Sequence, residues 1–197
     1  MDSEILSPET KNEIVTQTHS FIWEIFDTII KALILILIVL TFGFRMCTVV
    51  GSSMQNTLQN GEKLIITSLV KHPQAGDIIV FHETSYLNEP VVKRVIATGN
   101  HWVKIDFDNA IVYVSDDEVF DESDIINEEY VYLDIGLYRT TGVQTTFVPE
   151  GYLFVMGDNR NNSIDSRSKD IGVIDERTIL GKVIFRISPF DKFGIIN

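Results

Sequence analysis

The hydrophobic and polar positions along the chain follow two contrasting patterns. Residues 29–44 form a dense apolar block, and the run from Ala32 to Phe44 contains no charged side chain. This run is apolar on every helical face, whereas a helix on the surface of a soluble protein keeps one polar face. From Thr48 onward, short apolar runs alternate with turn signals, as is typical of strands. The pattern predicts one long apolar helix followed by a β-rich domain.

The apolar block predicts a transmembrane anchor over residues 23–46. Residues 7–9, Ser-Pro-Glu, are a good helix start, because serine caps a helix and proline suits its first turn. A helix that starts at Trp23 and ends with the block would be about 33 Å long, enough to cross a bilayer. Asp27 and Lys31 are four residues apart and can pair. A cleavable signal peptide fits less well, since no basic segment precedes the block and no Ala-x-Ala site follows it.

The remainder of the chain, residues 47–197, is predicted to be mainly antiparallel β structure. No helical period of useful length appears after residue 50. Residues 103–146 are more acidic and less regular, which predicts a smaller β subdomain inserted into the larger one. The expected strands are residues 63–67, 77–81, 91–98, 111–114, 152–156 and 182–187.

Composition excludes several classes of function. The net charge is −12, which argues against nucleic-acid binding because phosphate contacts need clustered Lys and Arg. Cys47 is the single cysteine, so no disulfide can form within the chain. The four histidines are scattered and no HExxH or paired Cys/His spacing is present, so we expect neither a metal nor a cofactor.

Two residues could carry nucleophilic chemistry. Lys93 lies between Val91 and Val95 on one apolar face of a predicted strand. Burial would lower its pKa, and a neutral amine can accept a proton from a serine hydroxyl. Ser53 follows a glycine in a predicted tight turn, where an exposed hydroxyl could act as a nucleophile. Spacing alone also allows a strand-edge lysine with its amine in water and a serine that only makes the turn.

Residues 157–167 form a third candidate segment. They are dense in Asp, Asn, Gly and Ser and therefore predict a loop. A calcium loop fits poorly, because Arg160 stands where a second oxygen ligand is needed. The segment instead offers carboxylates that could pair with Arg94 and Arg167.

Taken together, these segments resemble the type I signal peptidase family. The family pattern is a membrane anchor followed by four blocks, and this chain has the corresponding segments in the same order. They are Ser53–Leu58, Gly76–Phe81, Lys93-Arg94 and Gly157–Arg167. The last block is long and matches almost throughout. The short chain and the single predicted anchor are similar to the Gram-positive branch of the family.

The resemblance implies a serine protease with a Ser–Lys dyad. Ser53 would be the nucleophile, Lys93 the general base, and Ser163 would hydrogen-bond the lysine amine. The backbone N–H of Ser53 would hold the oxyanion, and no metal or cofactor would take part. The family cleaves signal peptides from exported preproteins after small residues at the −1 and −3 positions.

The resemblance also implies structural support around the dyad. Arg94 would pair with Asp158, and Asp165 with Arg167. The chain departs from the family at Gly51, where some members carry a serine that donates to the oxyanion, and it has asparagine in place of proline at position 56.

Location and partners follow from the same resemblance, because the basic residues around the predicted anchor do not decide its orientation. Residues 1–22 would lie in the cytoplasm and residues 47–197 on the extracytoplasmic face of the cell membrane. The expected partners are preprotein signal peptides, the lipid bilayer and secretion or pilus-assembly machinery, but not nucleic acid. Two alternatives are a self-cleaving repressor of the LexA-like type and a catalytically impaired, membrane-anchored factor that assembles a dedicated substrate such as a pilin.

Overall fold

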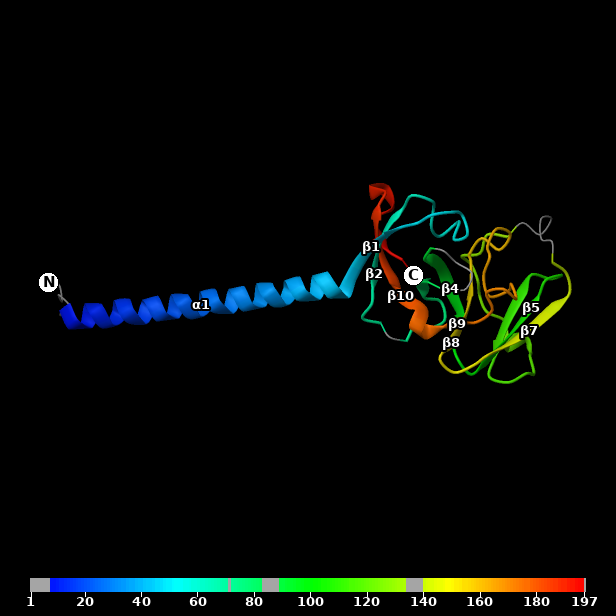
Figure 1. Ribbon diagram of the computed structural model, residues 1–197, viewed down its shortest axis with the longest axis horizontal. Helices are drawn as coiled ribbons and strands as arrows, with labels where there is room; N and C mark the ends of the chain where they lie inside the picture. Colours follow the sequence, from blue (N-terminus) through cyan, green and yellow to red (C-terminus); the bar gives the residue numbers. More distant parts are fainter. Residues whose placement is uncertain (1–7, 71, 83–88, 134–139, 197) are drawn as a thin grey trace. The chain divides into compact units, whose positions relative to one another are not determined.

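The computed structural model describes residues 8–70, 72–82, 89–133 and 140–196. It divides the chain into two compact units, Met1–Gly43 and Phe44–Asn197 (Figure 1). The division falls slightly before the predicted boundary between residues 46 and 47, because Phe44–Thr48 already forms the first strand of the second unit.

The first unit is helix α1, which spans Pro8–Gly43. The helix begins at the predicted proline, while the predicted cap Ser7 lies outside the described residues. The predicted ion pair is present, since Lys31 Nζ donates to Asp27 Oδ2 at 2.7 Å. Over the part of the chain that the structure describes, no helix is both long enough and apolar enough to cross a membrane. The transmembrane anchor predicted over residues 23–46 is therefore not confirmed.

The second unit contains two antiparallel sheets among its described residues. The larger has eight strands in the order β1-β2-β10-β3-β4-β8-β9, and β11 pairs with β10. Its strands are β1 (Phe44–Thr48), β2 (Lys63–Thr67), β3 (Ile78–Phe81), β4 (Val91–Ala97), β8 (Tyr152–Met156), β9 (Ile174–Asp175), β10 (Ile179–Ser188) and β11 (Gly194–Ile195). All six predicted strands are present, with ends within a few residues of those expected.

The smaller sheet occupies the predicted inserted region. Its strands β5 (His101–Asp106), β6 (Ile111–Ser115) and β7 (Val143–Val148) pair in the order β6-β5-β7. Strands β5 and β7 are visible beside β8 in Figure 1. Three short 3₁₀ turns complete the described elements: η1 (Glu122–Asp124), η3 (Glu176–Thr178) and η4 (Phe190–Lys192).

Strand β4 is buried on both faces, and this decides where the chemistry lies. On one face Val95 joins a cluster with Phe81 and Leu153, while Ile96 joins a second cluster with Phe154. The second cluster includes inward side chains of β5, so it fastens the small sheet onto the large one. A strand buried on both faces withdraws any polar side chain that it carries from water.

Candidate functional site

Lys93 is withdrawn from water and meets Ser53. The residue is only 4% exposed, and its Nζ lies 2.7 Å from Ser53 Oγ. On one side β4 pairs with β3, where Lys93 is opposite Ile79. On the other side the pairing with β8 begins only at Arg94. The alternative in which the lysine head escapes to water is therefore wrong, and the structure brings together the two residues that the sequence singled out.

The surroundings of Lys93 favour the neutral amine. The pKa of Lys93 is lowered to about 8, mainly by burial and in smaller part by the positive charge of Arg167. The carboxylates of Asp165 and Asp158 act in the opposite direction and raise the pKa. Burial is the largest effect, because an ammonium group loses hydration that distant carboxylates do not replace. A base with a pKa near 8 can accept a proton close to neutral pH.

The turn that presents Ser53 is fastened at both ends. Gly51 has φ +93°, a conformation that favours glycine, and its N–H donates to Asn60 Oδ1 at 2.9 Å. After the serine, Met54 and Leu58 are buried in the hydrophobic core, and the Leu58 N–H donates to the Met54 carbonyl at 2.7 Å. The buried side chains hold the turn, so the hydroxyl of Ser53 can face Lys93.

The loop after β8 also holds the nucleophile turn through Asn159. The Asn159 N–H donates to the Ser53 carbonyl at 2.9 Å, and its side-chain Nδ2 donates to the Ser52 carbonyl at 3.1 Å. Asn162 Nδ2 donates to Ser52 Oγ at 2.8 Å. Neither asparagine was expected from the sequence to hold this turn, although both lie in the segment that carries the family resemblance.

Ser163 occupies a crowded position beside Gly157. Its Oγ is buried and forms no hydrogen bond of standard geometry, so the hydrogen bond expected to the Lys93 amine is not seen. The hydroxyl is nevertheless close enough to the Asp165 carboxylate to help lower the pKa of that group. A Cβ atom on Gly157 would lie 2.5 Å from the Ser53 carbonyl oxygen and closer still to Ser163 Oγ. The absence of a side chain at Gly157 therefore allows the Ser53 backbone and the Ser163 side chain to pack closely against it.

Arg94 and Asp158 form a buried ion pair behind the dyad. Arg94 Nε donates to Asp158 Oδ1 at 3.0 Å, and Nη2 donates to Oδ2 at 2.9 Å. Their side chains are 2% and 1% exposed. Arg94 Nη1 also donates to the Gly76 carbonyl, and Thr57 Oγ1 donates to Asp158 Oδ2 at 2.5 Å. One carboxylate thus connects strand β4, the nucleophile turn and the loop after β8.

Asp165 and Arg167 form the second pair that the resemblance implied. Arg167 Nε donates to Asp165 Oδ1 at 2.8 Å, and Nη2 donates to Oδ2 at 2.9 Å. Burial raises the pKa of Asp165, but the hydrogen bonds and charge of Arg167 outweigh burial, so the pKa lies below its ordinary value. Asp165 Oδ2 also accepts the N–H of Gly157, which ties this pair to the crowded position beside Ser163.

A groove beside the dyad could admit an extended chain. Its volume is about 270 Å³, and its lining includes Ser53 and Lys93. The remaining walls are mostly small or aliphatic, including Val50, Val80 and Val91. Residues 91–93 of β4 line this groove, and among the described strand pairs they have no partner in β8. An unpaired strand edge is a template for a peptide in extended conformation.

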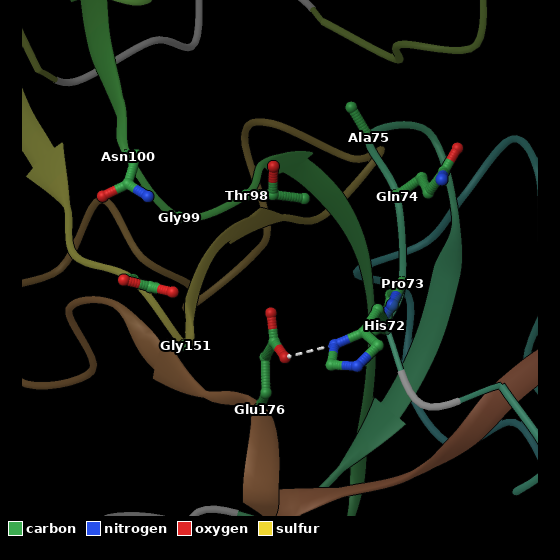
Figure 2. Close-up of a pocket in the computed structure, with 10 residues that line it drawn as sticks. His72, Pro73, Gln74, Ala75, Thr98, Gly99, Asn100, Gly151 and Glu176 are labelled. Atoms are coloured by element: carbon green, nitrogen blue, oxygen red, sulfur yellow. Dashed lines mark hydrogen bonds and ion pairs between the residues drawn. The ribbon is translucent and has the colours of Figure 1, made fainter.

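A second cleft, shown in Figure 2, lies apart from the dyad. It has a volume of about 570 Å³, and neither Ser53 nor Lys93 lines it. His72 Nδ1 and Glu176 Oε2 are 3.3 Å apart within it (Figure 2). Among the described residues, no group of three His, Cys, Asp or Glu side chains could hold a metal ion. The groove at Ser53 is the better candidate for the functional site, because Ser53 and Lys93 both line it.

Comparison with known proteins agrees with this geometry. The family described as "Signal peptidase, peptidase S26" matches residues 22–188. The chain belongs to the signal peptidase S26 family. The matched range includes both dyad residues and the whole loop from Gly157 to Arg167.

Individual family members show the extent of the similarity. The chain is 33% identical to the probable signal peptidase I-1 of Synechocystis sp. over 194 residues, which cover 93% of this chain and 91% of the relative. It is 31% identical to signal peptidase IB of Staphylococcus aureus over 177 residues, which cover 84% and 89%. A crystal structure of a signal peptidase I from Enterococcus faecalis is 26% identical, with a TM-score of 0.36, and covers 57% of this chain and 97% of that one.

Proposed function

We propose that this chain is a signal peptidase I, a serine endopeptidase that removes signal peptides from exported preproteins with a Ser53–Lys93 dyad. The observation that carries the proposal is the 2.7 Å contact between a buried Lys93 amine and the Ser53 hydroxyl. Membership in the signal peptidase family supports the substrate class.

The proposed reaction is acyl transfer through a covalent intermediate. Neutral Lys93 accepts the proton of Ser53 Oγ as the oxygen attacks the scissile carbonyl carbon. The backbone N–H of Ser53 donates to the developing oxyanion. The Lys93 ammonium then gives its proton to the leaving amine, and the C–N bond breaks. The neutral amine next activates a water molecule, which hydrolyses the ester and restores Ser53.

The groove is consistent with selection for small side chains. We propose that the substrate lies extended along the open edge of residues 91–93, with its −1 and −3 side chains against the apolar wall of the groove. The wall includes Val50 and Val91, and the space is only about 270 Å³. Small residues such as alanine would fit there, whereas a large side chain would have to displace part of the wall.

Helix α1 is proposed to hold the enzyme at the cell membrane. Large apolar side chains along the helix are exposed, among them Leu33, Leu37 and Leu40. Exposed apolar surface of this extent favours transfer into lipid. Single-pass topology, with the N-terminus in the cytoplasm and the peptidase domain outside, remains part of this proposal. Labelling of introduced cysteines from either side of sealed vesicles would test that orientation.

The decisive experiment uses the full chain in detergent and a preprotein with an Ala-x-Ala site. We expect cleavage after that site by the wild type and none by Ser53→Ala or Lys93→Ala, with circular dichroism confirming that both variants fold. Equal cleavage by Lys93→Ala would overturn the dyad. No cleavage by folded wild-type protein of this or any other preprotein tested would favour the assembly-factor alternative.

A further inference from the structure

The inserted region reaches back to the catalytic loop through one short segment, residues 128–132. The Tyr132 N–H donates to the Asp158 carbonyl at 2.8 Å, and the Arg160 N–H donates to the Tyr132 carbonyl at 3.0 Å. These two bonds form a parallel bridge between Tyr132 and Asn159. The ring of Tyr130 lies under the Arg94 guanidinium, 3.9 Å from the ring centre to Cζ. The segment therefore contacts the loop after β8, which contains Asp158 and which hydrogen-bonds the Ser53 carbonyl through Asn159.

Glu128 makes the strongest of these contacts. Both of its carboxylate oxygens accept from Arg160, with Nη1 donating to Oε2 at 2.9 Å and Nη2 donating to Oε1. The hydroxyl of Tyr130 donates to the same Oε1 at 3.2 Å. The side chains of Arg160 and Glu128 are 5% and 11% exposed. A bidentate pair in such a setting fixes orientation as well as position.

Arg160 connects Glu128 to the turn that contains Ser53. Its Nε donates to the Gly157 carbonyl at 3.1 Å, and its own carbonyl accepts from Arg167 Nη1 at 3.0 Å. Gly157 is packed against the Ser53 carbonyl and Ser163 Oγ. The guanidinium held by Glu128 is thus directly bonded to the residue that abuts the nucleophile turn.

We propose that Glu128 is a positioning residue for the reaction, which acts through Arg160 to hold Gly157 and Ser53 in place against Lys93. The inference rests on the proposed function, and it assigns a task to the acidic inserted region. Without the carboxylate, the buried Arg160 guanidinium has no counter-charge and must move toward water. The Gly157 carbonyl then loses the hydrogen bond from Arg160 Nε, and the packing that shields Lys93 from water loosens.

This arrangement predicts a signature beyond a loss of activity. The charged groups that face Lys93 are Asp165, Arg167 and Asp158 from the loop after β8, with Glu89 on the wall of the groove. Glu128 is not among them, so its removal changes the pKa of Lys93 only by changing hydration. Water that enters a loosened site favours the ammonium form and moves the pKa of Lys93 upward.

The test compares four full-length proteins: wild type, Glu128→Gln, a double variant with Glu128→Leu and Arg160→Met, and the control Glu129→Ala. Glu129 is an exposed neighbour of the same type and contacts only Asn127 among the described hydrogen bonds. Apolar replacement of a buried ion pair is often neutral for stability, so the double variant keeps the fold while it removes the donor to Gly157. We expect kcat on the Ala-x-Ala preprotein to fall roughly tenfold to a hundredfold in both Glu128 variants, with KM little changed. The acid limb of the pH profile should move to higher pH, and Glu129→Ala should match wild type.

Hydrogen exchange separates this inference from the proposed function. Faster exchange of the backbone amides at positions 159 and 160 in the Glu128 variants, with unchanged exchange in β10, supports the positioning role. This readout holds even if the wild type cleaves none of the substrates tested. The positioning role would be overturned if both Glu128 variants had the same kcat, pH profile and hydrogen exchange as the wild type. An equal loss of kcat in Glu129→Ala would overturn it as well. The loss would then come from removing a negative charge in this region and not from breaking the contact with Arg160.

Discussion

At the scale of single residues, the site depends on a lysine that is brought out of water beside a half-buried serine. Lys93 would be an ordinary ammonium on an exposed strand, and Ser53 an ordinary turn hydroxyl. Burial on β4 lowers the lysine pKa to about 8, and the packed turn aims the hydroxyl at the amine. Lys93 needs no unusual chemistry of its own, because burial weakens its preference for the charged form.

Activity should therefore depend on pH in one direction. Below a pH of about 8 Lys93 is mostly the ammonium and cannot accept the Ser53 proton, while above it the free amine predominates. We expect kcat/KM to rise from pH 6 and to level off above about pH 8. Initial rates in buffers of constant ionic strength would measure this, and a flat profile between pH 6 and pH 9 would exclude a lysine base.

Gly157 should tolerate no side chain. In Gly157→Ala the new Cβ would lie 2.5 Å from the Ser53 carbonyl oxygen, and this backbone atom cannot move without moving the nucleophile. We expect kcat/KM to fall by about a hundredfold, since a displacement of about 1 Å is enough for such a loss. Gly194→Ala is the matched control, because a Cβ there meets nothing within 4 Å. Full activity in Gly157→Ala would show that the contact is not needed.

At the scale of elements, strand β4 connects the chemistry to the core. One residue after Lys93, the strand turns Arg94 to the opposite side, where it meets Asp158. The same strand carries the apolar side chains that pack on both faces of the sheet. In the proposed mechanism, this short stretch of sequence would supply the base, its buried support and an edge for the substrate.

The Arg94–Asp158 pair should be needed for stability as well as for geometry. Asp158→Asn removes the charge that balances a buried guanidinium, and breaking one side of such a pair costs about 3–5 kcal/mol. We expect the free energy of unfolding to fall by roughly that amount, as measured by denaturation in urea. Pairing Arg94→Met with Asp158→Leu should recover most of the loss. Equal instability of the single and paired variants would contradict the ion-pair explanation.

At the scale of the whole molecule, the proposed function assigns attachment to one unit of the chain and catalysis to the other. The unit Phe44–Asn197 contains both sheets, the dyad and all the ion pairs described around it. The described part of the unit Met1–Gly43 is helix α1, whose described large side chains are mainly apolar and exposed. The two parts can therefore be tested separately.

Removal of residues 1–43 should leave a folded peptidase unit. Strand β1 begins at Phe44 and pairs with β2, so the cut falls before the first strand of the sheet. We expect a fragment that starts at Phe44 to keep the β-type circular dichroism spectrum and to cleave a short soluble peptide at a rate within about threefold of the full chain. It should no longer pellet with lipid vesicles. Loss of cooperative unfolding in the fragment would contradict this division.

The sequence by itself determined the elements and pointed to the groups that we propose to react. Alternation along residues 63–67, 91–98 and 152–156 predicts strands because side chains on a strand point to opposite faces in turn. The four blocks that resemble signal peptidases identify Ser53 and Lys93, since residue type and order survive in the sequence. The long helix was also evident from its apolar block, although a membrane crossing was not confirmed.

Only the tertiary structure decided the geometry of these contacts and the further residues that support them. Ser53 and Lys93 are 40 positions apart, and their 2.7 Å contact depends on a turn packed by Met54 and Leu58. No periodic pattern in the sequence predicts three of the contacts. They are the hydrogen bond from Asn159 to Ser53, the close packing of Ser163 against Gly157 and the ion pair between Glu128 and Arg160. Local patterns report on faces of strands and helices, whereas contacts between distant loops depend on how those faces pack. The burial that sets the pKa of Lys93 is a property of that packing alone.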